Sequence, residues 1–139
     1  MRNTQIADKI SIVMAVVPTI GTPGTMTATA VDGSLFGRCA FVLTTGAATA
    51  TGTLDLKIQS SATSGGSYAD VTSAAIVQIV AASCANKQYM IDIPIDSAHP
   101  FMKCVCVTGT AAIVNSIVAI LYRGVNPPAT TYATQLIQL

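Results

Sequence analysis

The residue types best suited to metal binding or covalent cross-linking are four cysteines and one histidine: Cys39, Cys84, Cys104, Cys106 and His99. On a strand, Cys104 and Cys106 point to the same face about 6.6 Å apart along the chain, which suits neither a mutual disulfide nor the C-x-x-C spacing of zinc sites. A metal site joining these two to Cys39 and His99 is conceivable, but small buried thiols are the commoner case. We therefore expect reduced core cysteines, no metal and no cofactor.

His99 is the only histidine and lies in Ser97-Ala-His-Pro100, just before an expected strand. A Ser/His/Asp triad is not indicated, because the sequence has no G-x-S-x-G nucleophile elbow. Asp92 and Asp96 could supply the two carboxylates of a glycoside hydrolase, but Asp92 falls on the polar face of a strand, where an ordinary solvated charge is expected. We expect a turn histidine, no catalytic residues and no enzymatic activity.

Motifs for phosphate and calcium binding are missing from the sequence. It has no G-x-x-x-x-G-K-[ST], no G-x-G-x-x-G and no EF-hand spacing, and Ser64-Gly-Gly-Ser67 lacks the lysine and the following helix of a phosphate loop. Tryptophan is absent and only 5% of residues are aromatic, which is few for stacking against sugars or bases.

Charge is sparse in this chain of 139 residues, a length that fits one domain. Seven Lys and Arg residues nearly balance six acidic ones, only 9% of residues are charged, and 51% are hydrophobic. Such a chain has no strong field to attract nucleic acid or acidic lipid, so we expect neither as a partner. The weak repulsion between copies favours association.

No membrane-spanning segment is expected, because the longest apolar runs, such as Ile12–Val17 and Ile117–Tyr122, have about six residues against the ~18 that a bilayer requires. The start of the chain imitates a secretion signal, but the small residues Ala28-Thr-Ala30 follow too late for cleavage and Asp8 dilutes the basic region. The apolar run after residue 9 is therefore interpreted as a first strand.

The elements that must position these residues are strands. Thr53–Ser60 and Gln88–Ile95 alternate between apolar and polar residues, which is typical of half-buried strands. Phe101–Thr108 and Ile113–Arg123 flank a turn-like Thr108-Gly-Thr-Ala-Ala112 and predict a hairpin. The further predicted strands are Ile10–Val17, Thr25–Val31, Gly37–Thr45 and Ile76–Val80, with a short helix over Ala74–Ala85 as the competing assignment.

About eight short strands with turn-forming stretches between them predict an all-β fold, a jelly-roll-like antiparallel β-sandwich. We divide the chain into an N-terminal arm (1–9), the sandwich domain (10–123) and a C-terminal arm (124–139). The C-terminal arm is too apolar to stay solvated, so it either covers its own domain or crosses to a neighbour. The candidate partner contacts on the two arms are Arg2, Tyr132, Leu136, Ile137 and Leu139.

Parts of this pattern resemble small virion proteins of tailed phages. The resemblance covers most of residues 35 to 128 and rests on Leu54-x-Leu-x-Ile58-Gln-Ser-Ser-x-x-Ser-Gly-Gly-Ser-Tyr68-x-Asp70-Val71, Tyr89-x-Ile-x-Ile93, Phe101-x-Lys-x-Val105-x-Val107-x-Gly109 and Ala119-Ile-Leu-Tyr122. It is similar to the capsid cement, or decoration, proteins of short-tailed phages. The resemblance implies a jelly roll that sits outside an HK97-like shell and joins neighbouring capsomers, with no catalytic residues.

The partner implied by this resemblance is the major capsid protein, and the implied location is the capsid surface of the virion, after synthesis in the bacterial cytoplasm. Many copies making modest contacts would let avidity replace high single-site affinity. Since a two-fold contact is the commonest way for identical chains to pair, we also expect a homodimer or a higher cyclic oligomer.

Two other functions are weighed beside this one. A phage fibre or adhesin-type β-sandwich would bind a host surface glycan and needs exposed aromatic rings, for which Tyr68, Tyr89, Tyr122 and Tyr132 are the only tyrosines. A head-to-tail connector or tail-tube component would instead form a closed ring.

Overall fold

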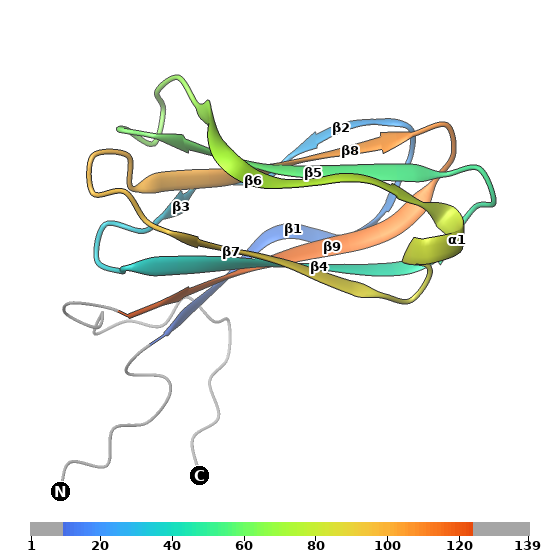
Figure 1. The fold of residues 1–139 in the computed structure, drawn as a ribbon, viewed down its shortest axis with the longest axis horizontal. Coiled ribbons are helices and arrows are strands. Elements are labelled where there is room, and N and C mark those ends of the chain that lie inside the picture. The colour runs from blue at the N-terminus through green and yellow to red at the C-terminus, as the bar shows by residue number, and fades with distance from the viewer. Residues whose placement is uncertain (1–9, 124–139) are drawn as a thin grey trace, which may run out of the picture.

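The computed structural model describes residues 10–123, which form nine strands and one short helix (Figure 1). The bounds are β1 Ser11–Gly21, β2 Gly24–Thr27, β3 Val31–Asp32, β4 Arg38–Ala48, β5 Thr53–Ser61, β6 Ala69–Val80, α1 Ala81–Cys84, β7 Gln88–Pro94, β8 Phe101–Gly109 and β9 Ile113–Tyr122.

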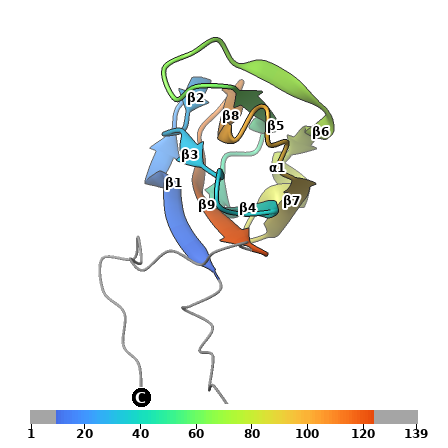
Figure 2. The ribbon, with the colours of Figure 1, turned by 90° about the vertical axis from the view of Figure 1, so that its left-hand side faces the viewer.

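The strands form two antiparallel sheets that face each other, as the end-on view in Figure 2 shows. Sheet A has the order β1-β9-β4-β7, and sheet B has the order β2-β8-β5-β6 with β3 also paired to β8. Because β5 occupies one edge of β8, β2 and β3 pair with successive stretches of its other edge and together fill a single strand position. The two sheets therefore have eight strand positions. This arrangement confirms the predicted jelly-roll-like β-sandwich of about eight strands.

The predicted hairpin over residues 101–123 is wrong. β8 lies in sheet B beside β5 and β2, whereas β9 lies in sheet A between β1 and β4 (Figure 1). The connection after Gly109 therefore crosses from one sheet to the other instead of turning back within one. The alternation of apolar and polar residues shows that both segments are strands. The same alternation is expected whether the two strands pair in a hairpin or lie in different sheets, so it did not reveal which strands pair.

The first strand is longer than predicted. β1 passes through Pro18 to Gly21, although the sequence predicted an end at Val17. β1 is an edge strand of sheet A, and its register against β9 shifts between Val16 and Thr19. A proline is tolerated at such an edge irregularity because no neighbouring strand needs the missing N–H.

Two other predicted boundaries also move. The strand expected over 25–31 is divided into β2 and β3, and the strand expected over 76–80 begins at Ala69 as β6. The competing helix over 74–85 is confined to the single turn of α1. The small residues at the start of β6 do not alternate between apolar and polar, so the sequence gave no sign of a strand there. They are extended because they pair with β5.

The core lies between the two sheets and is built from the predicted inward residues. Leu54, Leu56 and Ile58 of β5 are fully buried, and Ile91 and Ile93 of β7 pack into the same cluster. Burying each such aliphatic side chain contributes roughly 1.5–3 kcal/mol relative to leaving it in water. The predicted alternation of β5 and β7 is therefore confirmed.

The four cysteines are buried as free thiols, as expected for core residues. Burial disfavours the thiolate and raises the pKa of Cys39 and Cys104 to about 12 and that of Cys106 to about 11. Thiols of such high pKa are poor nucleophiles and poor metal ligands at neutral pH. In the part of the chain that the structure describes, no three His, Cys, Asp or Glu residues gather closely enough to hold a metal ion.

Candidate interaction surface

The outward face of sheet B carries charged side chains, with the apolar Val105 and Val107 of β8 beside them. Asp55 and Lys57 alternate with the buried residues of β5 and therefore point outward. Lys57 Nζ lies 2.9 Å from Asp70 Oδ2 on β6, and Gln59 Nε2 donates to the other Asp70 oxygen at 2.7 Å. These hydrogen bonds lower the pKa of Asp70. This face is typical of the solvated side of an antiparallel sheet.

The outward face of sheet A is different, because apolar residues cross all four strands. The strand register places Met14 of β1 opposite Val118 of β9, Val118 opposite Val42 of β4, and Val42 opposite Met90 of β7. The neighbouring inward residues of β9 are fully buried, so the side chain of Val118 points away from the core. The result is an apolar row across the width of the sheet.

A second apolar row lies beside the first. Ile12 pairs with Ile120, and Ile120 pairs with Ala40 on its other side. The edge strands are the most exposed part of these rows: Met90 is 64% exposed, Met14 56% and Ile12 42%. We call this set the apolar face, and it comprises Ile12, Met14, Ala40, Val42, Met90, Val118 and Ile120.

A cluster of three polar side chains borders the apolar face at one end. Arg38 NH2 lies 3.0 Å from Asp92 Oδ2, Tyr122 OH donates to the same oxygen at 2.6 Å, and Arg38 Nε donates to Tyr122 OH at 2.9 Å. Partial burial disfavours ionisation of Asp92, but these hydrogen bonds outweigh it and lower its pKa. The hydrogen bonds to Asp92 and Tyr122 raise the pKa of Arg38.

Asp92 is therefore not the ordinary solvated charge that the sequence predicted. It lies on the outward face of β7, as expected, but it is bonded to side chains of two other strands. Arg38, Asp92 and Tyr122 are far apart in the sequence, and only the pairing of β4 with β7 and β9 brings them together. No local pattern could have revealed this cluster.

At the opposite end the apolar face meets a row of neutral polar residues. Ser116, Thr44 and Gln88 lie opposite one another on β9, β4 and β7. An apolar centre with polar borders is the usual anatomy of a protein–protein contact.

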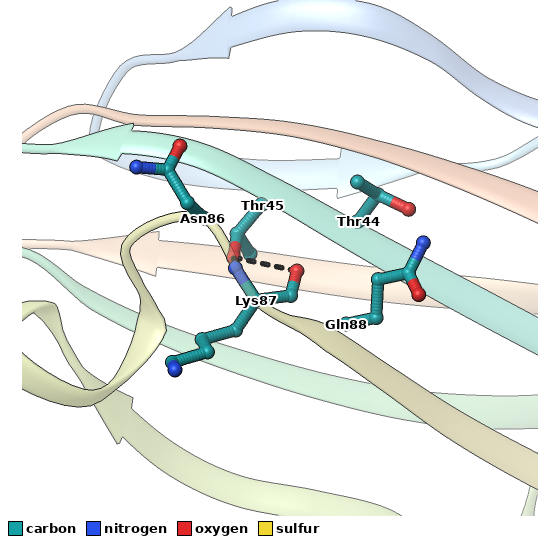
Figure 3. Close-up of a pocket in the computed structure, with 5 residues that line it drawn as sticks. All are labelled: Thr44, Thr45, Asn86, Lys87 and Gln88. Carbon is teal, nitrogen blue, oxygen red and sulfur yellow. Dashed lines mark hydrogen bonds between the residues drawn. The ribbon is translucent and has the colours of Figure 1, made fainter.

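A shallow depression of about 430 Å³ adjoins this polar row and is drawn in Figure 3. Its five lining residues are Thr44, Thr45, Asn86, Lys87 and Gln88. The Lys87 amide donates to Thr45 Oγ1 at 3.2 Å, and the Thr45 amide donates to the Lys87 carbonyl at 2.9 Å, so the floor is held by bonds within the protein. None of the five side chains is aromatic, so the depression offers no ring for a sugar to stack on.

The tyrosines within the described residues are engaged in contacts of their own. Tyr68 donates to the Ser64 carbonyl at 2.9 Å, and Lys103 Nζ lies 4.1 Å from the centre of its ring. Tyr89 donates to the Ser83 carbonyl at 2.8 Å. Because Lys103 already covers the Tyr68 ring, that ring is a poor platform for a ligand.

His99 lies in a turn, as predicted. Its Nδ1 is 2.8 Å from Asp96 Oδ2, and this contact together with the Ala98 amide lowers the pKa of Asp96. Both side chains are exposed, so the pair lacks the enclosed surroundings of a catalytic centre.

The predicted partner contacts lie outside the described residues, and the apolar face was missed at the sequence level. Those predicted contacts are Arg2, Tyr132, Leu136, Ile137 and Leu139. One available signal for the apolar face was the unbroken run Ile117–Tyr122, since a strand that is apolar on both faces is normally covered on both. None of the helices in residues 10–123 is long and apolar enough to cross a membrane.

No protein-family model matches the chain, and no curated protein sequence matches it. Among solved structures, PBSX exported protein XepA is similar, with a TM-score of 0.58 and 8% identity over 98% of this chain and 44% of that chain. The structure of infectious bursal disease virus, Gx strain, has a TM-score of 0.52 and 12% identity, over 86% of this chain and 34% of that one. T=1 particles derived from infectious bursal virus give a TM-score of 0.51 and 13% identity, over 86% and 33%.

These similarities show the fold. At such low identity, the shared feature is the antiparallel jelly-roll sandwich, which occurs in an exported protein and in virus particles. The chain spans less than half the length of each of these matched chains.

Proposed function

We propose that this chain is a structural virion protein that decorates the outside of a tailed-phage capsid and bridges neighbouring capsomers. The observation that carries the proposal is the apolar face of sheet A, bordered by polar rows, on a sandwich whose other outer face is charged. A surface of this kind is suited to contact with another protein. The jelly-roll fold shared with virus particles supports the proposal.

The proposed mechanism is adhesion by many copies. A bridging protein needs at least two contacts, and repeated modest contacts give strong total binding when the copies are held on one shell. We propose the major capsid protein and further copies of this chain as the partners, with the arm residues Arg2, Tyr132, Leu136, Ile137 and Leu139 as contacts to the shell. We propose no enzymatic role, no cofactor, and neither nucleic acid nor membrane as a partner.

The test is reconstitution on capsids that lack this protein. Purified chain is added to undecorated shells, and the shells are separated by sedimentation and then challenged by heat or low salt. We expect the chain to co-sediment at saturable stoichiometry and to raise the temperature at which shells break. Shells that neither bind the chain nor gain resistance would refute the proposal.

A glycan-binding adhesin is the second candidate. It is favoured by the depression beside Gln88, where the amides of Asn86 and Gln88 could hydrogen-bond sugar hydroxyls. The missing aromatic lining makes this the weaker candidate. Clear binding on a glycan array that is lost in an Asn86→Ala, Gln88→Ala double variant would favour it over decoration.

A further inference from the structure

We infer that the apolar face is a two-fold contact on which a second copy of this chain packs, sheet A against sheet A. The inference rests on the proposed function for the claim that this face meets protein. Beyond the proposed function, the inference names the surface, which is the apolar face, and the partner, which is the same face of a second copy.

The charges on sheet A fit a contact between identical surfaces. A two-fold contact brings equivalent surfaces together, so unpaired charges near the axis repel their own copies. The four strands of sheet A contain only Arg38 and Asp92 as charged residues, and these two neutralise each other 3.0 Å apart. The strands of sheet B contain five charged residues: Asp32, Asp55, Lys57, Asp70 and Lys103. Lys57 pairs with Asp70, but three further charges remain, so sheet B fits a two-fold contact less well.

The layout of the rows is self-complementary. The row of Met14, Val118, Val42 and Met90 is apolar on all four strands, whereas the row of Ile12, Ile120 and Ala40 ends at Asp92 on β7. The remaining members of the Arg38 cluster lie on one side of these rows, and Ser116, Thr44 and Gln88 lie on the other. A two-fold axis that lies between the two sheets and runs parallel to the strands places each row against the same row of the other copy with the strand order reversed. Met14 then faces Met90, Val118 faces Val42, and the polar row faces the polar row. Two sheets stacked in this way lie about 10 Å apart, as inside an ordinary β-sandwich.

The whole outward surface of sheet A, with the apolar face at its centre, is large enough for a specific dimer. Four strands about 4.8 Å apart and roughly nine residues long, at about 3.4 Å per residue, give a footprint of roughly 600 Å² per copy. Two copies then bury roughly 1,200 Å², the lower end of the range for stable interfaces. The dimer is therefore expected to dissociate on dilution instead of being permanent.

The exposed methionines supply a selective test on the full-length chain. In Met14→Glu and Met90→Glu, a charge enters the apolar face at a position that is already solvent-exposed in the single chain, so folding is preserved. The matched control is Leu35→Glu, because Leu35 is apolar and 49% exposed but lies outside the strands of sheet A. Circular dichroism and thermal melting verify that the three variants fold.

Sedimentation equilibrium over a range of concentrations measures the dimer dissociation constant. We expect a dimer for the wild type and for Leu35→Glu, and a dissociation constant at least roughly tenfold higher for Met14→Glu and for Met90→Glu, since each substitution occurs twice in the contact. A wild type that stays monomeric, as it would if an arm covered the face, overturns the inference. So does a dimer that both glutamates leave unchanged.

The result is independent of the shell experiment. If the chain is monomeric but still binds and reinforces shells, the two-fold contact is refuted and the decoration function is supported. If the chain forms a dimer that depends on Met14 and Met90 but does not bind shells, the two-fold contact is supported and the decoration function is refuted.

Discussion

At the level of single residues, the polar cluster shows how exposed groups on neighbouring strands fix one another. Asp92 accepts hydrogen bonds from Arg38 and Tyr122, and each of the three side chains comes from a different strand of sheet A. A half-exposed ion pair contributes little by itself. The cluster keeps one carboxylate ionised at the border of an apolar surface.

The lowered pKa of Asp92 predicts a pH dependence of stability. A carboxyl whose pKa is lower in the folded than in the unfolded chain stabilises the fold above the unfolded value of ~3.9, and this contribution is lost as pH falls through the folded value. We expect urea midpoints to fall with acidification below about pH 4, and Asp92→Asn to remove part of that fall. Asp70 and Asp96, whose pKa values are also lowered, supply the remainder.

Tyr122→Phe provides the control for this prediction. It keeps the ring but removes a hydrogen bond that lowers the pKa of Asp92. Stability at neutral pH should therefore fall, and the acid-dependent loss should become smaller by a similar amount. Identical pH profiles for the wild type and Asp92→Asn would contradict the assignment.

The buried thiols give a second prediction at this scale. Because burial raises the pKa of Cys39 to about 12 and closes access to it, a thiol reagent at mildly alkaline pH should find no reactive cysteine in the folded chain. After unfolding without reductant, all four cysteines should react. Fewer than four thiols released on unfolding would indicate a disulfide.

The residue types predicted which side chains are buried, but they did not predict which side chains on different strands contact one another. The cysteines could be placed in the core because thiols are small and apolar and because Cys104 and Cys106 share one strand face. The bond between Asp92 and Tyr122 could not be foreseen, because it depends on the register of strands that are remote in sequence.

At the level of elements, alternation in β5 and β7 predicted both the strands and their inward residues. What it did not predict is the neighbour of each strand. β8 and β9 have the signature of a hairpin, yet they belong to opposite sheets because each fills a position between two other strands. The missed apolar face has the same cause, since its rows exist only once β1, β9, β4 and β7 are side by side.

The end of β1 offers a test of close packing between elements. A Cβ added at Gly21 would lie 2.8 Å from Asn115 Nδ2 and 3.0 Å from both the Ile113 carbonyl and Thr108 Oγ1. We expect Gly21→Ala to lower the free energy of unfolding by about 1–3 kcal/mol, the usual cost of overpacking. The measurement is urea denaturation followed by circular dichroism.

Gly65→Ala is the matched control, because nothing lies within 4 Å of a Cβ placed there. Its effect should stay within about 0.5 kcal/mol, as for ordinary surface substitutions. Equal effects of the two substitutions would show that β1 does not pack against β9 as described.

At the level of the whole molecule, the sandwich is two-sided in its chemistry. The outward face of sheet B carries the charged residues Asp55, Lys57 and Asp70, while the middle of sheet A presents aliphatic side chains. From the low charge content of the sequence we predicted that copies associate, and the apolar face is the surface that we propose for this association.

The chemistry of the contact predicts its response to salt. Raising sodium chloride from about 0.1 M to about 1 M shortens the Debye length from ~10 Å to ~3 Å and weakens charge-driven association. A contact built on the apolar face should keep its dissociation constant within about threefold, and sulfate should strengthen it. Sedimentation at several salt concentrations checks this, and steep weakening by sodium chloride would assign the contact to charged residues instead.

The pairing of β1 with β9 also has a kinetic consequence. The two strands begin and end the described domain, so sheet A lacks one of its two central strands, β9, until nearly the whole domain has been synthesised. Among the strand pairs, only β5 with β6 joins consecutive strands. A topology of such high contact order is expected to fold in milliseconds to seconds, and sheet A is completed only after β9 has been synthesised.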